Sequence, residues 1–275
     1  MANVPTKVYD RLSIGIKKFQ PILNTAKSRD VNESDTVIII TDMLSEIFGY
    51  DKYSEITSEF TVRSTYCDLA IKLDSKLAFL IEVKAVGLEL KDSFVKQAVD
   101  YAANQGIDFV VLTNGVLWRV YKISFTKPID QELVFEFDFL SLSHKNSDDI
   151  ERLSLLSKEG WLKSFLYEYH SQKQALSKFF LSALILSDPI TDVIKRELRK
   201  ISPDVKVTSE QIKDVIQLEV LKREVMEGDK ADEAKKKINK VFNKISKSKN
   251  TKQTLSETVE DEDSEIVKND DDKNV

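Results

Sequence analysis

The sequence predicts an α/β protein in which a mixed β-sheet is flanked by helices and followed by a helical C-terminal region. Residues 66–84 alternate between apolar and mixed positions, which is the pattern of two paired strands. Residues 32–49 and 88–105 carry apolar side chains at helical spacing. Residues 107–112 form a continuous apolar run, which is typical of an interior strand. Strands and helices in this order predict a sheet covered by helices.

The composition divides the chain of 275 residues into four parts. They are an N-terminal extension (1–31), the domain that holds the sheet (32–140), a helical region (141–249) and an acidic tail (250–275). Pro5 and Pro21 interrupt the extension, where we expect one short helix before Pro21. The tail holds nine acidic and three basic residues and few large apolar ones, so we expect it to be disordered.

The first helix of the sheet domain has clear signals at both ends. Asn32 is a favourable cap, and Glu33 places negative charge in the first turn, where the helix dipole favours it. Gly49 ends the helix. Glu33 lies four residues before Val37, on the core side of the helix. The second helix of this domain is expected to end at Gly106.

The segment 66–84 is predicted to form a β-hairpin with a three-residue loop at 74–76. Counting outward from this loop places Asp68 opposite Glu82 on the neighbouring strand, and Lys84 lies two residues along the same face. The three charged side chains are therefore expected to converge on one surface of the sheet.

Two opposed carboxylates on a sheet repel each other unless a positive charge lies between them. Mg²⁺ is held by one or two carboxylates and keeps water or phosphate oxygens in its other positions, so it would relieve the repulsion between Asp68 and Glu82. The alternative is an ordinary hairpin whose solvent face is charged.

The remaining strands and turns follow from shorter signals. Strands are expected at 55–62 and 133–139. Asn114 and Gly115 are the preferred pair for a type I′ turn into the next strand. On that strand, Trp118 is interpreted as a packing residue.

The region after residue 141 is predicted to be helical. Helices are expected at 148–158 and 161–186, with further starts at Asp188 and at Thr208, where Gln211 fits a capping box. The lysine-rich segment 230–249 has apolar residues at helical spacing and predicts an amphipathic helix. One interpretation is that this helix and the acidic tail are simply solvated. The other is that the helix contacts DNA phosphates and that the tail competes with the DNA for the helix.

The charged residues of the hairpin carry a resemblance to a known superfamily. Asp68, followed by Glu82, Val83 and Lys84, resembles the D…ExK core of the PD-(D/E)xK nucleases. Cys67 stands where these nucleases commonly have a proline before the aspartate.

The next predicted elements extend this resemblance. Gln97 and Tyr101 have the spacing of the QxxxY motif of the RecB-like branch. Asn114, Gly115 and Trp118 then resemble the N-terminal nuclease domain of type I restriction enzyme R subunits. The ordered set of motifs is more specific than ExK alone, and it lies in residues 32–123.

The resemblance implies a restriction-endonuclease-like core and Mg²⁺-dependent hydrolysis of DNA, with Mn²⁺ as a substitute for Mg²⁺. Asp68, Glu82 and the Val83 carbonyl would be metal ligands, and Lys84 would orient water or stabilise developing charge. DNA and restriction–modification subunits would be the partners. The alternative is a non-catalytic DNA-binding or regulatory module that keeps the fold and docks onto a restriction–modification complex.

Three further residues have two interpretations each. By resemblance, Gln97 and Tyr101 position the substrate; otherwise Gln97 caps a sheet edge and Tyr101 packs in the core. Gln97 is expected on the apolar stripe of its helix, where a buried amide needs hydrogen-bond partners. Glu33 is either an auxiliary residue of the metal site or only compensates the helix dipole.

Several function classes are excluded or disfavoured by the sequence. No GxxxxGK[ST] motif is present, so no ATP site is detected, and this departs from a full type I R subunit, in which a helicase follows the nuclease domain. The single cysteine, Cys67, is expected to be buried and inert, which fits a reducing cytoplasm. The first residues lack the apolar core of a signal peptide, and no membrane span is expected. The net charge of −5 comes from the tail, which carries −6, so the rest of the chain carries +1.

Overall fold

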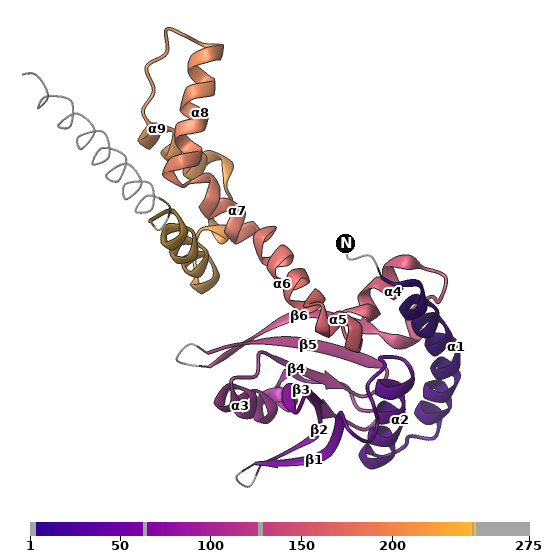
Figure 1. Ribbon diagram of the computed structural model, residues 1–275. Coiled ribbons are helices and arrows are strands. Elements are labelled where there is room, and N and C mark those ends of the chain that lie inside the picture. Colours follow the sequence, from indigo (N-terminus) through magenta and orange to yellow (C-terminus); the bar gives the residue numbers. More distant parts are fainter. Residues whose placement is uncertain (1–3, 63–64, 126–128, 244, 246–275) are drawn as a thin grey trace, which may run out of the picture. The chain divides into compact units, whose positions relative to one another are not determined.

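The computed structural model describes residues 4–62, 65–125, 129–243 and 245. It divides into two compact units, Met1–His170 and Ser171–Val275. The first unit contains the sheet, and the second contains helices (Figure 1). The acidic tail and the end of the lysine-rich segment lie outside the described residues, so the expectation of disorder there stays a prediction.

The first unit is built on a six-stranded sheet in which the strands follow chain order. The strands are β1 (Ile56–Val62), β2 (Thr65–Leu73), β3 (Lys76–Val83), β4 (Phe109–Thr113), β5 (Leu117–Ser124) and β6 (Asp130–Asp138). β3 and β4 pair in parallel, and the other neighbours are antiparallel. The sheet is therefore mixed, as predicted, and the parallel pair needs a crossover connection.

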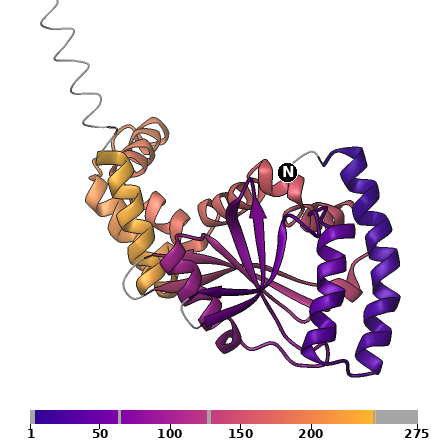
Figure 2. The ribbon, with the colours of Figure 1, turned by 60° about the horizontal axis from the view of Figure 1, so that its bottom comes forward.

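Helices cover both faces of this sheet (Figure 2). On one face, α1 (Thr6–Ser28) and α2 (Glu33–Glu46) pack over the larger apolar cluster, which includes Phe79, Ile81 and Trp118. On the other face lie the 3₁₀ turn η1 (Asp92–Val95) and α3 (Lys96–Gln105). α3 contacts β2, β3, β4 and β5 over a smaller cluster that includes Leu80 and Val110. This is the α/β, restriction-endonuclease-like arrangement that the sequence predicted.

α1 differs from the expectation of one short helix before Pro21. It runs for 23 residues with Pro21 inside it. Leu12, Ile16 and Leu23 are fully buried along one side of this helix, and Phe19 is 2% exposed. Burial of each such side chain contributes roughly 1.5–3 kcal/mol. The sum exceeds the roughly 3 kcal/mol that a proline costs in a helix interior, so core packing overrides the local signal.

The turn types of two hairpins also differ from expectation. Asp74 and Ser75 both have positive φ, 49° and 61°, which is the type I′ pattern, and Leu73 pairs directly with Lys76. In the β4–β5 turn only Gly115 has positive φ, 83°, so a type I′ turn at Asn114 and Gly115 is ruled out. The Asn114 side chain instead accepts the N–H groups of the following loop.

The rest of the first unit is short and mostly helical. It comprises the 3₁₀ turn η2 (Phe139–Ser141), α4 (Ser147–Ser154), α5 (Lys158–Leu162) and the start of α6 (Phe165–Ala175). The Arg11 guanidinium on α1 pairs with Glu159 on α5 through two hydrogen bonds of 2.7 and 2.6 Å. Trp118 is 1% exposed and donates its indole N–H to the Gly115 carbonyl, so its interpretation as a packing residue is confirmed.

The second unit continues the helical region. It holds α7 (Lys178–Ile185), α8 (Asp188–Ile201), α9 (Ser209–Val215), η3 (Ile216–Val220) and η4 (Arg223–Val225), and residues 229–243 are helical. Thr208 and Gln211 form the predicted capping box. Ala234 and Ile238 pack against Ala183, so the helix 229–243 is amphipathic as predicted. Across the described part of the chain, no helix combines the length and the apolar character that a bilayer crossing requires.

Candidate active site

Asp68 lies across from Glu82, but a different turn from the predicted one produces this register. The turn holds two residues rather than three, which alone would shift every pair by one residue. Ala78 is an extra, unpaired residue of β3 at a β-bulge, and it restores the register. Lys72 pairs with Leu77, and the next pair is Ile71 with Phe79. From the pair Leu69 with Ile81, one further step places Asp68 opposite Glu82. The predicted juxtaposition is therefore present.

The Asp68 carboxylate is fixed by the backbone of the next strand. Its Oδ2 accepts a hydrogen bond of 2.7 Å from the N–H of Val83. Burial raises the pKa of Asp68 above its ordinary value, although this hydrogen bond and the nearby Lys84 ammonium act in the opposite direction. The carboxylate is thus held in place but is short of compensating positive charge.

Glu82 and Lys84 form an ion pair at the end of β3. Lys84 Nζ donates to Glu82 Oε1 at 2.8 Å, and the two side chains are only 13% and 15% exposed. Burial raises the pKa of Glu82, and the Asp68 charge raises it further, whereas the Lys84 hydrogen bond lowers it. Burial lowers the pKa of Lys84, but its bonds to acidic partners prevail and raise it overall. Lys84 therefore stays protonated at neutral pH.

Glu33 reaches this pair from α2. It is the first residue of the helix, and Asn32 caps the helix by accepting the N–H of Asp35 at 2.9 Å. Glu33 Oε2 lies 3.4 Å from Lys84 Nζ, and its side chain is 47% exposed. Because Glu33 stands at the start of the helix, its negative charge compensates the helix dipole. Its contact with Lys84 also places the same carboxylate beside the site. Both interpretations of Glu33 are thus compatible with the structure.

Gln97 and Tyr101 lie on α3, on the sheet face that also carries Leu80 and Ala70. The expectation that Gln97 interrupts a core-facing stripe was wrong, because Gln97 is exposed. The regular helix begins only at Lys96, after a 3₁₀ turn with fewer residues per turn, so the apolar positions before it do not set the helical phase. Tyr101 is half-buried against the smaller cluster, and burial raises its pKa.

With this geometry in view, comparison with protein families gives one result. Residues 39–134 match the family described as type I restriction enzyme R protein N terminus. This segment resembles the N terminus of type I restriction enzyme R proteins. Asp68, Glu82, Lys84, Gln97 and Tyr101 lie inside this R-protein-like segment, whereas Glu33 precedes it. Comparisons with curated proteins and with solved structures gave no match.

Two carboxylates of the R-protein-like segment, those of Asp68 and Glu82, are the candidate ligands for a metal ion. In residues 4–62, 65–125, 129–243 and 245, no three His, Cys, Asp or Glu side chains gather closely enough to hold a metal ion. Glu33 therefore does not complete a three-carboxylate cluster with Asp68 and Glu82. Two hard oxygen donors with raised pKa values still fit Mg²⁺, which is commonly bound by one or two carboxylates.

Thr36 was not recognised from the sequence, and Asn114 was recognised only as a turn residue and as part of the resemblance. Thr36 of α2 accepts the N–H of Val86, just after Lys84, and Asn114 donates to the carbonyls of Val86 and Leu88. Thr36 is fully buried and Asn114 is 7% exposed. A signal was present, because a threonine on the buried side of an amphipathic helix needs a hydrogen-bond partner.

Cys67, which precedes Asp68, is the buried and inert thiol that the sequence predicted. It is 2% exposed, and its Sγ lies 3.3 Å from the Ile81 carbonyl. Burial, and then the charges of Glu82 and Asp68, raise the pKa of Cys67 to about 12. The thiolate that a nucleophile requires is therefore not populated at neutral pH.

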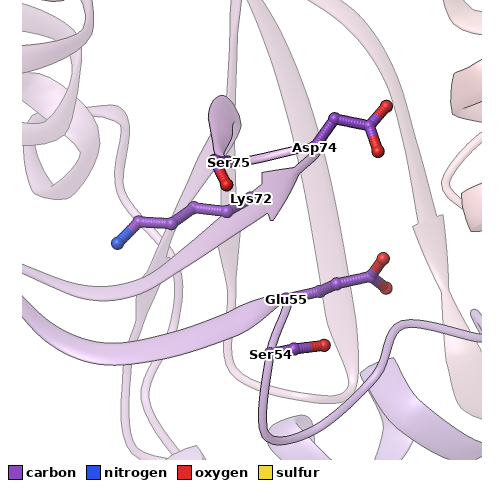
Figure 3. Close-up of a pocket in the computed structure, with 5 residues that line it drawn as sticks. All are labelled: Ser54, Glu55, Lys72, Asp74 and Ser75. Carbon is purple, nitrogen blue, oxygen red and sulfur yellow. The ribbon is translucent and has the colours of Figure 1, made fainter.

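A polar hollow lies at the other end of the same hairpin. It has a volume of about 400 Å³ and is lined by Ser54, Glu55, Lys72, Asp74 and Ser75. Figure 3 shows the Lys72 ammonium pointing away from the carboxylates of Glu55 and Asp74. Glu55 is already bonded to Lys158 and to the N–H of Asp51. Asp74 is six residues from Asp68, roughly 20 Å along a strand, so the hollow is separate from the carboxylate pair.

Proposed function

We propose that the R-protein-like segment is a restriction-type, Mg²⁺-dependent DNA endonuclease. The observation that supports this proposal most strongly is the placement of Asp68 across from Glu82, with Lys84 bonded to Glu82 and in contact with Glu33. The two carboxylates are largely withdrawn from solvent, and burial raises both pKa values. Such a site favours a cation that neutralises both groups.

Asp68, Glu82 and the Val83 carbonyl are the residues that would hold Mg²⁺. When bound, the ion would supply polarisation of a phosphate oxygen and a lower pKa for a coordinated water. Mn²⁺ prefers similar oxygen ligands and is expected to substitute for it. The hydrogen bond from Val83 commits one Asp68 oxygen and holds the carboxylate in one rotamer, which orients it for binding.

Lys84 contributes a fixed positive charge. Because its pKa is raised, its ammonium is protonated at neutral pH and acts as a hydrogen-bond donor rather than as a general base. From its position beside Glu82 it can orient a water molecule or stabilise negative charge that develops on a scissile phosphate. Glu33 would act through Lys84, which it contacts.

Gln97 and Tyr101 would position the substrate. α3 packs over the sheet face onto which Glu82 projects, because Glu82 alternates with Ile81 and shares its side of β3 with Leu80. An exposed amide at Gln97 is accessible to DNA, whereas a core-facing amide would not have been. Double-stranded or single-stranded DNA is the proposed substrate, and restriction–modification subunits are the proposed partners.

The proposed nuclease has no motor of its own within these 275 residues, because they contain no GxxxxGK[ST] motif. We therefore expect cleavage without ATP. The experiment is to incubate the purified protein with plasmid and with single-stranded DNA in Mg²⁺, in Mn²⁺ and in EDTA. Cleavage should require the divalent ion, and added ATP should not change its rate.

Variants assign the activity to the site. Asp68→Asn, Glu82→Gln and Lys84→Ala should each lower cleavage by at least about 100-fold, because the groups act as a unit. Asp74→Asn removes a carboxylate from the turn of the same hairpin and should leave cleavage unchanged. Undiminished activity in any of the three site variants contradicts the assignment. DNA binding without cleavage under either ion would favour a non-catalytic DNA-binding module.

A further inference from the structure

The chain segment that follows Lys84 is held by two buried side chains from distant elements. The N–H of Val86 donates to Thr36 Oγ1 at 3.2 Å. Asn114 Nδ2 donates to the carbonyl oxygens of Val86, at 3.3 Å, and of Leu88, at 2.9 Å. These three contacts join residues that are 50, 28 and 26 positions apart in the sequence. We call Thr36 and Asn114, with the segment 85–88 between them, the clamp.

Each side chain of the clamp is anchored on its other side. Thr36 Oγ1 donates to the Asn32 carbonyl at 2.8 Å, within the first turn of α2. Asn114 Oδ1 accepts the N–H groups of Val116 and Leu117 at 3.1 and 2.8 Å. The clamp therefore connects the start of α2, the segment after Lys84 and the β4–β5 turn through buried and part-buried hydrogen bonds. Leaving a buried partner of such a bond unsatisfied is costly.

The clamp lies close in the chain to two residues of the site, Lys84 and Glu33. Lys84 lies two residues before Val86, and its own N–H donates to the Thr113 carbonyl at 2.9 Å, next to Asn114. Glu33 lies three residues before Thr36 in the same helical turn. Glu33 and Lys84 meet at 3.4 Å.

We propose that Thr36 and Asn114 are positioning residues that fix Lys84 and Glu33 relative to each other in the nuclease site. This inference rests on the proposed function. Neither side chain contacts Asp68 or Glu82 in any described hydrogen bond, so both act through the backbone of the segment 85–88. Misplacement of a catalytic group by about 1 Å can cost about 100-fold in rate, so loss of the clamp should lower kcat.

Thr36 allows the sharper test because a single hydroxyl makes both of its hydrogen bonds. Thr36→Val is isosteric and removes both the bond to Asn32 and the bond from Val86. Thr41→Val removes the same kind of bond within α2, to the Val37 carbonyl, and is the matched control. Thr36→Ser keeps the hydroxyl and should restore most of the lost activity.

Asn114 is tested by Asn114→Asp. The carboxylate keeps the oxygen that accepts from Val116 and Leu117 but replaces the donor that faces the Val86 and Leu88 carbonyls. Asn104→Asp makes the same change on the exposed side of α3, where the amide bonds only to the Asp100 carbonyl, and is the control. The rate of hydrogen exchange at the Val86 amide shows whether the clamp is intact, and this measurement does not depend on DNA cleavage.

Positioning and purely structural roles give different kinetics. We expect Thr36→Val and Asn114→Asp to lower kcat about 10- to 100-fold, with KM for DNA changed less than about threefold, at a temperature where each variant is folded. Faster exchange at Val86 should accompany this loss. Unchanged kcat together with faster exchange would overturn the proposal, and so would failure of both variants to fold.

The outcome also separates this inference from the proposed function. If the wild-type protein cleaves DNA and the clamp variants cleave it equally well, the nuclease assignment stands and the positioning role falls. If the wild-type protein cleaves nothing in Mg²⁺ or Mn²⁺, the proposed function fails and the positioning role falls with it, even where exchange at Val86 confirms the clamp as a structural feature.

Discussion

The Asp68 carboxylate on β2 accepts a hydrogen bond of 2.7 Å from the backbone N–H of Val83 on β3, the other strand of the hairpin. The side chain thus takes part in strand pairing just beyond the backbone pair of Leu69 with Ile81. A hydrogen bond to a charged acceptor is stronger than one between neutral groups, so it fixes the rotamer of Asp68. Burial nevertheless keeps the pKa of this carboxylate above its ordinary value.

The buried negative charge of the carboxylates predicts that substitutions of Asp68 and of Lys84 change the stability of the protein in opposite directions. A raised pKa means that the folded state binds the proton more tightly than the unfolded state, so the ionised carboxylate costs stability above that pKa. In EDTA at pH 7, Asp68→Asn should therefore raise the thermal unfolding midpoint. Lys84→Ala should lower it, because Glu82 loses its partner. A midpoint for Lys84→Ala at or above that of the wild type would contradict this account.

Gln97→Leu should separate activity from stability. Because Gln97 is exposed, the substitution should change the free energy of unfolding by less than about 0.5 kcal/mol. DNA cleavage should nevertheless fall if the amide positions the substrate. Asn104→Leu on the same helix, also exposed, is the control for an added apolar side chain. Full cleavage by Gln97→Leu would remove this residue from the proposed site.

The β2–β3 turn offers a stabilising substitution. Ser75 has φ of 61°, a conformation that costs an L-residue other than glycine roughly 1 kcal/mol. Ser75→Gly should therefore raise the free energy of unfolding by several tenths of a kcal/mol, since part of the gain is lost to unfolded-state entropy. Urea unfolding measures the change. Ser58→Gly, in the middle of β1, should destabilise the protein and is the contrasting control.

The ion pair between Arg11 and Glu159 predicts a defined pH dependence. The Arg11 hydrogen bonds hold the pKa of Glu159 below its ordinary value of 4.5. The stabilisation is therefore present above that ordinary pKa and is lost as the pH falls through the lowered value. Because Glu159 is 36% exposed, solvent screens the pair and the effect is modest.

Tryptophan fluorescence can follow this unfolding, because both tryptophans, Trp118 and Trp161, lie in the first unit. Glu159→Gln should be less stable than the wild type at pH 7, and the difference should shrink as the pH falls below about 4. Glu197→Gln removes an exposed carboxylate from the second unit and should show no such trend. A constant difference between pH 7 and pH 3 would contradict the prediction.

The comparison of prediction and structure is most instructive at the hairpin. Asp68 and Glu82 are opposed as predicted, although the loop was assigned one residue too many. The alternation of apolar residues specifies which face each side chain takes, and a one-residue slip would bury the charges. The extra residue at Ala78 therefore compensates for the shorter turn, and the buried face, not the turn, decides the register.

The sequence by itself determined the α/β class, the mixed sheet and the order of the D, ExK and QxxxY residues, because period and motif order are local properties of the chain. Only the tertiary structure decided that α1 continues through Pro21, that Gln97 is exposed, and that Thr36 and Asn114 hold the segment after Lys84. These features depend on contacts between residues far apart in the sequence. Core burial and the need to satisfy buried polar groups there outweigh local propensity.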